Sequence, residues 1–255
     1  MFIEELRKIE KLHLEIAGIH PALGKLSPVA VVTPAENRIT IYDVNPSGHY
    51  ECVAEKTASF PLPDRIEAAF PLEFYDPSKS CCIVSENVFE DKNSFVTVFH
   101  EFVHCYQFAT CELKIKSSLL IAKKYPDSMW EINHPFPYTE AFFVNAFGEV
   151  KNAVEYSYSA RLVEVFRSMK SRLQQTDYEY LIWQMWKEGL ARYVENCIRE
   201  KYGLDKNTCG SQLPYDRISM YYLGELLISY LRKKNEAVVE DIEALYRAFY
   251  EFQYL

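Results

Sequence analysis

Residues 94–110 read SFVTVFHEFVHCYQFAT, and His100-Glu101-Phe102-Val103-His104 within them forms the pattern H-E-x-x-H. Residues four apart lie one above the other on the same face of an α-helix, so His100 and His104 can direct two imidazoles at one metal ion. Glu101 lies one step round the helix, within reach of a water on that metal. The pattern is typical of two zinc ligands and a general base.

The sequence around this motif favours a metal site. Residues 94–110 are apolar on nearly every side, which is typical of a buried helix. Two histidines and a glutamate inside such a helix are costly unless they are paired or bound to a metal. The competing interpretation is a helix that carries two histidines without any metal. We expect a zinc site.

Composition limits the class of protein and its partners. The chain has 255 residues, of which 49% are hydrophobic, enough for one large domain or for a small lobe joined to a larger one. The net charge of −8 and the lack of a basic block argue against nucleic acid and anionic membranes as partners. Neither a secretory signal nor a membrane span is evident. The seven scattered cysteines favour reduced thiols and a cytoplasmic location. The oligomeric state stays open.

The first 92 residues are expected to form a small α/β lobe with a mixed sheet. Apolar spacing predicts an amphipathic helix over residues 2–17. Alternating or continuous apolar runs predict strands at residues 28–33, 38–43, 49–54 and 80–85. The proline-rich stretch 60–77 is expected to be loop, with a short helix near Ile66. The strand at 80–85 is either an ordinary sheet strand or one that borders the cleft and pairs with an extended substrate.

Residues 93–255 are expected to form a larger, mostly helical lobe. Asp177 stands where a helix N-cap belongs, and Gly203 where a helix C′ residue belongs. The predicted helices cover residues 94–111, 113–124, 139–173 with an interruption near Gly148, 177–202, 216–234 and 236–253. Because no linker separates independent domains, we predict one α+β unit over residues 1–255, with its cleft between the two lobes.

A zinc site needs a third protein ligand, and Glu188 is the best candidate. It lies in WKEGLARYVE, residues 186–195. Gly189 in mid-helix costs about 1 kcal/mol relative to alanine. A close approach of this helix to the motif helix would compensate for that cost. The alternative is an ion pair between Glu188 and Arg192. Weaker ligand candidates are Glu195, Glu140, His134 and a thiolate from Cys81 or Cys82.

HEFVH followed by an EGLARYVE helix resembles the gluzincins, the zinc peptidases whose third ligand is a glutamate. The corresponding helix of the M1 aminopeptidases reads roughly N-E-G-F-A-x-Y-x-E, and its first glutamate binds zinc. Plant basic secretory proteins carry a similar E-G-x-A-D-Y helix and a glutamine three residues after the second histidine, where Gln107 stands here. The resemblance implies a zincin-like fold with Glu188 as the third ligand. Glu188 follows His104 by 84 residues, a longer spacer than in the M1 enzymes.

Tyr221-Tyr222-Leu223-Gly224 resembles the Y-x-x-G segment of M1-type enzymes. That resemblance implies that Tyr221 donates a hydrogen bond to the oxyanion of the tetrahedral intermediate. Tyr222 and Tyr215 are alternatives, and Tyr221 can equally serve only to pack. Glu86-Asn87 resembles the E-N pair of the amine-recognising loop, but Glu86 is expected at the surface or in a turn. We expect structural or exposed roles for His13, His20 and His49.

These features together predict a zinc-dependent metallopeptidase that acts on peptides or proteins, with Glu101 as the general base. Whether it cleaves within chains or at their ends is left open. A second hypothesis is a zinc-stabilised structural or regulatory protein, because Cys105 beside His104 and the crowded apolar helix are compatible with a closed site. A third is a metallohydrolase that does not act on peptides.

Overall fold

A computed structural model of the protein describes residues 2–90 and 93–252. The chain forms two compact units. The first comprises Met1–Thr110 and Cys197–Asp205, and the second comprises Cys111–Asn196 and Lys206–Leu255.

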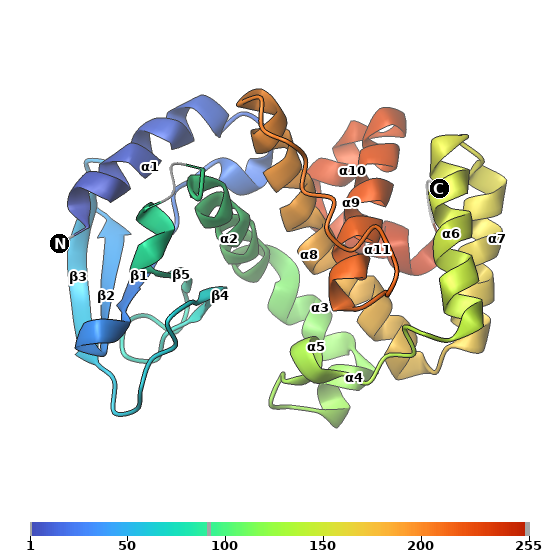
Figure 1. The fold of residues 1–255 in the computed structure, drawn as a ribbon, viewed down its shortest axis with the longest axis horizontal. Helices are drawn as coiled ribbons and strands as arrows, with labels where there is room; N and C mark the ends of the chain where they lie inside the picture. Colours follow the sequence, from blue (N-terminus) through green and yellow to red (C-terminus); the bar gives the residue numbers. More distant parts are fainter. Residues whose placement is uncertain (1, 91–92, 253–255) are drawn as a thin grey trace. The chain divides into compact units, whose positions relative to one another are not determined.

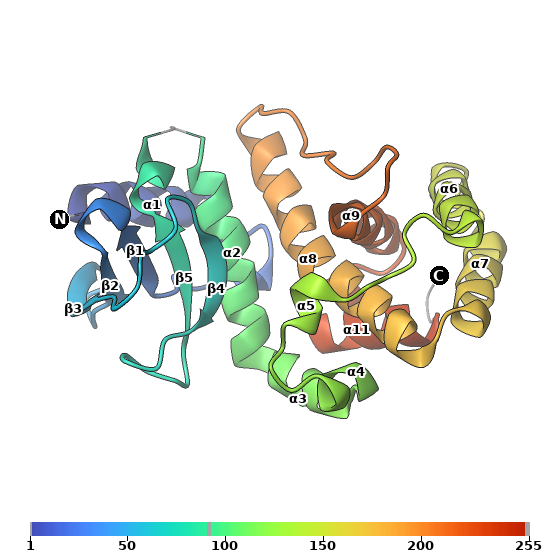
Figure 2. The ribbon, with the colours of Figure 1, turned by 60° about the horizontal axis from the view of Figure 1, so that its bottom comes forward.

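The first unit is built on a five-stranded mixed sheet (Figures 1 and 2). Its strand order is β3-β2-β1-β5-β4, with β1 parallel to β5 and every other neighbouring pair antiparallel. The strands are β1 (Val29–Thr33), β2 (Arg38–Val44), β3 (Tyr50–Thr57), β4 (Glu67–Pro71) and β5 (Ser80–Ser85). The predicted α+β class with a mixed sheet is therefore confirmed, as are the strands at 28–33, 38–43, 49–54 and 80–85.

Strand β4 was not predicted, and the expectation of loop and a short helix near Ile66 is wrong there. The segment Glu67–Pro71 has little intrinsic strand preference, because glutamate, alanine and proline are all depleted in strands. Its backbone is ordered by antiparallel pairing with β5, from Glu67 opposite Val84 to Pro71 opposite Ser80. Tertiary pairing thus overrides local propensity, and proline is tolerated because β4 is an edge strand.

The position of β5 decides between the two alternatives for this strand, in favour of an ordinary sheet strand. β5 has β1 on one side and β4 on the other, so neither of its edges is available to an extended substrate. All six of its residues are buried. The edge strands of this sheet are β3 and β4, and β4 is the one that contacts the motif helix.

Two helices cover one face of the sheet, α1 (Ile3–Ile16) and the motif helix α2 (Phe95–Gln107). The Tyr42 hydroxyl accepts a hydrogen bond from the backbone N–H of Phe2 at the start of α1, and the Cys82 thiol donates to the carbonyl of Val98 in α2. The two helices meet where the ring of His13 stacks on Phe99, with centroids 6.4 Å apart. The helix predicted at 2–17 is confirmed.

The opposite face of the sheet is covered by the segment between β3 and β5. The buried side chains of Ala30, Val32, Ile41, Cys81 and Ile83 form a cluster there, against which apolar residues of this segment pack. Both faces of β1 and β5 are therefore shielded from water, which explains their continuous apolar runs.

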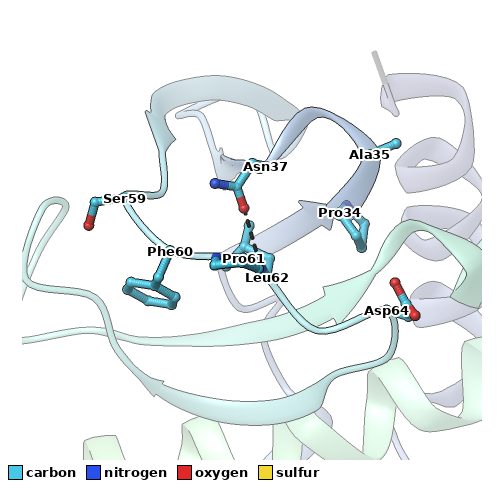
Figure 3. A pocket seen from close by; sticks show the side chains of 8 residues that line it. All are labelled: Pro34, Ala35, Asn37, Ser59, Phe60, Pro61, Leu62 and Asp64. Carbon is cyan, nitrogen blue, oxygen red and sulfur yellow. Dashed lines mark hydrogen bonds between the residues drawn. The ribbon is translucent and has the colours of Figure 1, made fainter.

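Asn37 anchors the start of this covering segment (Figure 3). It has a left-handed backbone, with φ of 51°, a conformation that asparagine tolerates well. Its side chain accepts a hydrogen bond from the N–H of Leu62 at 3.0 Å and donates one to the carbonyl of Ala58 at 2.7 Å. Asn37 also lines a surface pocket together with Pro34, Ala35, Ser59, Phe60, Pro61, Leu62 and Asp64.

The motif helix belongs to the first unit, whereas the sequence placed residues 93 onward with the helical lobe. The reason is packing, because α2 lies against β4 and β5 and buries Val98, Phe99, Phe102 and Val103. After Gln107 the helix continues as one π-helical turn, Phe108–Glu112, which leads into the second unit.

The second unit is helical. It includes α8 except for the last turn of that helix, which begins at Cys197 and belongs to the first unit. Its helices are α3 (Leu113–Ser118), α4 (Leu120–Lys124), α5 (Trp130–Asn133), α6 (Ala141–Glu155), α7 (Ser159–Arg172), α8 (Gln175–Lys201), α9 (Arg217–Lys234), α10 (Glu236–Glu240) and α11 (Ile242–Glu251). Three short helices of the first unit, Pro21–Leu23, Pro34–Glu36 and Glu86–Phe89, are of the 3-10 type.

The interruption expected near Gly148 lies elsewhere. Gly148 is inside α6, and the break falls between Glu155 and Ser159, where Ser157 has φ of 56°. A single glycine costs a helix only about 1 kcal/mol, which tertiary packing easily offsets. Asp177 is likewise inside the first turn of α8 rather than at its N-cap.

Two helix boundaries follow sequence signals closely. Gly203 is the C′ residue of α8, as predicted, with φ of 66°. The amides of Gly203 and Leu204 donate to the carbonyls of Glu200 and Arg199, which is a Schellman arrangement. At the start of α9, Asp216 and Ser219 form a reciprocal capping box.

Helices α8 and α9 make backbone contact at two glycines. A Cβ atom added to Gly189 would lie 2.6 Å from the Cα of Gly224, and one added to Gly224 would lie 2.1 Å from the carbonyl oxygen of Met185. The close approach inferred from Gly189 therefore exists, but its partner is α9 and not the motif helix.

We expect Gly224→Ala to lower the free energy of unfolding by about 3 kcal/mol, because the new methyl group forces the two backbones apart. Gly148→Ala is the matched control. A Cβ at Gly148 meets nothing within 4 Å, so alanine should raise stability by up to about 1 kcal/mol through helix propensity. Urea titration followed by circular dichroism measures both. A Gly224→Ala protein as stable as the wild type would contradict the contact.

Candidate metal centre

The H-E-x-x-H residues come together on α2 as their spacing predicts. Ligand atoms of His100, Glu101 and His104 all lie within 4.8 Å of one another, and this is the one such group found among residues 2–90 and 93–252. The imidazole centroids of His100 and His104 are 5.1 Å apart. Glu101 and His104 are each only 6% exposed. This group could hold a metal ion.

Gln107 orients one of the two imidazoles. Its side-chain oxygen lies 2.8 Å from Nδ1 of His104, and Gln107 is fully buried. With Nδ1–H donating to that oxygen, the lone pair of His104 is on Nε2 and is available to a metal. Metal-binding histidines commonly have such a hydrogen-bonding partner on the other ring nitrogen, which sets both tautomer and orientation. The donor set therefore fits a divalent metal ion.

The thiols near the motif are poor metal ligands. Burial raises the pKa of Cys81 to about 11, and it raises the pKa of Cys82 well above its usual range. Both side chains are held inside the sheet on β5. Burial also raises the pKa of Cys105, beside His104, to about 12. Among residues 2–90 and 93–252, the possible metal-binding group at the motif contains no cysteine, which argues against the alternative with a thiolate ligand.

Glu188 lies in the second unit, where it is half-buried on α8. Its carboxylate is hydrogen-bonded to the side chain of Tyr221 on α9. The glycine contact explains this pairing. Gly189 follows Glu188 directly, and Gly224 lies three residues after Tyr221, on the same face of α9. Two residues that the sequence singled out are therefore neighbours.

Tyr221 is suited to donate a hydrogen bond. It is 7% exposed. Burial and the adjacent Glu188 carboxylate raise its pKa far above its usual range, although Arg217 opposes the shift. The phenol therefore keeps its proton. Tyr215 and Tyr222 instead face Phe147, with ring centroids 4.0 and 6.4 Å away, so packing accounts for both alternatives.

Arg192 pairs with Glu195 on α8, whereas the alternative from the sequence had it pair with Glu188. The Arg192 guanidinium lies 3.4 Å from the Glu195 carboxylate and donates to the carbonyls of Asn207 and Cys209. Glu195 also accepts a hydrogen bond from the side chain of Asn207. Because these local contacts occupy the carboxylate of Glu195, this residue is a poor candidate for a metal ligand.

The remaining ligand candidates, His134 and Glu140, lie at structural positions, and so do the histidines outside the motif. His134 lies 2.7 Å from Asp177, and Glu140 is exposed at the N-cap of α6. Nε2 of His13 is 2.6 Å from the carbonyl oxygen of Leu23, and His20 caps the helix at Pro21–Leu23. The exposed His49 pairs with Glu10. Glu86 begins a short 3-10 helix.

A buried ion cluster sets the rotation of α8 about its axis. Lys187 Nζ lies 2.8 Å from Glu112 and 3.0 Å from Glu131, and Lys116 also pairs with Glu131. Burial alone would lower the pKa of Lys187, but Glu131 and Glu112 outweigh it and hold that pKa above its usual range. Lys187 is anchored in this way, and the next residue, Glu188, pairs with Tyr221.

Sequence reasoning missed Arg217. It occupies the first turn of α9, and its guanidinium lies 5.3 Å from the centroid of the Tyr221 ring. No motif marks this position. The one signal in the sequence is its spacing, because Arg217 precedes Tyr221 by four residues and so shares a face of α9 with it.

Comparison of the chain with models of protein families, with curated proteins and with solved structures found no match. Among residues 2–90 and 93–252, no helix combines the length and the apolar character needed to cross a membrane.

We expect Gln107→Leu to weaken zinc binding by about 10- to 100-fold, because His104 loses the partner that sets its tautomer. Competition with a chromophoric chelator measures the dissociation constant. Gln174→Leu, at an exposed position just before α8, is the control and should leave the constant unchanged. Equal zinc affinity in the Gln107→Leu protein and the wild type would rule out this role of Gln107.

Proposed function

We propose that the protein is a zinc-dependent metallopeptidase of the gluzincin type. The observation that carries the proposal is the group formed by His100, Glu101 and His104 on one buried helix, with Gln107 holding His104. The pairing of Glu188 with Tyr221 supports it, because these are the two residues of the second unit that such a site requires.

In the proposed site His100, His104 and Glu188 would hold the zinc ion. Two imidazoles and one carboxylate are a ligand set that catalytic zinc sites use. When bound there, zinc supplies a Lewis acid that lowers the pKa of a coordinated water to about 7. Glu188 brings a negative charge to the ligand set, and its hydrogen bond with Tyr221 restrains the carboxylate.

Glu101 is the proposed general base. It takes a proton from the attacking water as the oxygen of that water bonds to the peptide carbonyl carbon, and it then passes the proton to the leaving nitrogen as the C–N bond breaks. Tyr221 keeps its proton. Its one O–H is directed at Glu188 in the resting protein, so in this mechanism it leaves that carboxylate and donates to the oxyanion as the negative charge develops. The products are a carboxylate and an amine, with one water consumed.

The substrate is a peptide or a protein in extended form, and β4 is the strand proposed to pair with it. β4 is an edge strand and contacts the motif helix. Adding a strand to a sheet edge gives main-chain hydrogen bonds whose energy does not depend on the substrate side chains. We assign this role to β4 and not to β5, because both edges of β5 are already paired with neighbouring strands.

The metal assignment predicts one equivalent of zinc per chain, lost in His100→Ala and in Glu188→Ala. Removing one of three ligands takes away a direct bond to the ion. Glu140→Ala, at an exposed glutamate, is the matched control and should retain zinc. Inductively coupled plasma mass spectrometry of protein dialysed without chelators gives the stoichiometry. A Glu188→Ala protein that keeps one equivalent of zinc would show that another residue is the third ligand.

Glu101→Gln should retain zinc and lose about 10²- to 10⁴-fold in kcat, because the amide cannot accept the proton of the water. Hydrolysis of a quenched fluorescent peptide library measures the rate, and metal analysis of the same sample confirms that the site is loaded. Full activity in the Glu101→Gln protein would eliminate Glu101 as the base.

The burial of Glu101 and His104 favours a second candidate, a zinc-stabilised protein whose site is closed to substrate. Such a protein would bind zinc and lose stability on chelation, yet it would cleave no peptide. The two measurements above separate the candidates, because both predict bound zinc but only the peptidase predicts hydrolysis that depends on Glu101. A screen of non-peptide substrates distinguishes a metallohydrolase of another kind.

A further inference from the structure

Arg217 is a half-buried cation beside the two residues proposed to act in catalysis from the second unit. Its guanidinium lies 5.3 Å from the ring centroid of Tyr221, and its charge interacts with that of Glu188. The hydroxyls of Tyr138 and Tyr180, which are hydrogen-bonded to each other at 3.0 Å, also interact electrostatically with Arg217. The groups that influence the charge of Arg217 are thus three phenols and one carboxylate, that of Glu188.

Arg217 makes no ion pair in the described part of the chain, residues 2–90 and 93–252. Its sequence neighbour Asp216 is committed to capping α9, where it accepts the amide of Ser219 at 3.2 Å. Arg192 offers an internal comparison. It lies 5.7 Å from the same tyrosine ring, but it is matched by Glu195 and by two backbone carbonyls. Of the two guanidinium groups at Tyr221, only that of Arg192 is in an ion pair within residues 2–90 and 93–252.

Binding of a metal ion by Glu188 would leave the positive charge of Arg217 less compensated. Once Glu188 shares its negative charge with a divalent cation, little of that charge is left to compensate Arg217. A partly desolvated guanidinium is stabilised by an anion that offers two oxygens in its plane, and a carboxylate has that geometry. Arginine favours carboxylates over neutral amides because its hydrogen bonds to them are charge-assisted.

We propose that Arg217 binds a carboxylate of the peptide substrate, close to the bond that is cut. The inference rests on the proposed peptidase function and adds the substrate class to it. The carboxylate comes either from the C-terminus of the substrate, which makes the enzyme a carboxypeptidase, or from an aspartate or glutamate side chain near the scissile bond. Arg217 is then a specificity-determining residue that touches substrate, while Glu101 and the metal ligands perform the chemistry.

Three N-acetylated hexapeptides with one internal sequence test the proposal. The first ends in a free carboxylate, the second in an amide, and the third in an amidated glutamate, so that only its side chain is acidic. Their affinities are measured by calorimetry on the zinc-loaded Glu101→Gln protein, which does not turn them over, and kcat/KM is measured on the wild type. Arg217→Gln is the test variant in each background, with Arg217→Lys as partial rescue. Arg167→Gln removes an exposed arginine on α7 and is the matched control.

We expect an acidic peptide to bind about 10- to 100-fold more tightly than the neutral amide, the range typical of a charge-assisted hydrogen-bonding pair. Arg217→Gln should abolish this preference while zinc content stays at one equivalent, and Arg167→Gln should preserve it. A preference for the first peptide alone identifies the terminal carboxylate, and a preference for the third identifies the side chain. Either result supports the proposal.

Equal binding of all three peptides by zinc-loaded protein overturns the proposal, and so does a preference that survives in Arg217→Gln. The wild-type comparison needs no substitution at Arg217, so poor folding of a variant cannot mask the answer. Failure of the proposed function gives a different pattern. A carboxylate preference without hydrolysis leaves Arg217 as a carboxylate site, whereas hydrolysis of free and amidated peptides at equal rates leaves a peptidase without this specificity.

Discussion

The contact between Gly189 and Gly224 is the constraint on which the pairing of Glu188 with Tyr221 depends. Two helices can approach to backbone contact only where neither has a side chain, and here the space for a Cβ on either glycine is already occupied by the other helix. The helix axes are therefore closest at this point. Residues that flank it, Glu188 on α8 and Tyr221 on α9, are brought within hydrogen-bonding distance as a consequence. Helix propensity disfavours both glycines, so the packing geometry must offset their cost.

The group formed by His100, Glu101 and His104 depends on the burial of α2 against the sheet. Phe99 and Phe102 are fully buried, and Phe99 is held by ring contacts with His13, Phe95 and Phe102. A helix fixed so firmly gives its polar residues little freedom, which is what a site needs if its ligands are to be placed before the metal arrives. Gln107 adds to this rigidity, since it is fully buried and holds His104.

Secondary structure was predictable wherever local pattern and tertiary environment agreed. The strand at 80–85 is continuous in apolar residues because both faces of β5 are covered, and the Schellman ending at Gly203 follows from a glycine in a left-handed conformation. β4 was missed because its alternation is poor and its order comes from β5. The helix break was expected at Gly148, but the chain turns at Ser157, whose positive φ no sequence rule singles out.

The sequence by itself determined that His100, Glu101 and His104 share one helix and converge, because helical periodicity acts over four residues and needs no other part of the chain. It also pointed to Glu188 and Tyr221 as candidates, and to a close contact at Gly189. Only the tertiary structure decided which of these residues contact one another. The partner of Gly189 is Gly224, Arg192 pairs with Glu195, and Arg217 is left beside Tyr221 without an ion pair in the described part of the chain. The contact of the two glycines depends on how α8 and α9 cross, which is set by side-chain volumes distributed over the whole interface. Arg192 and Glu195, by contrast, pair three residues apart within α8.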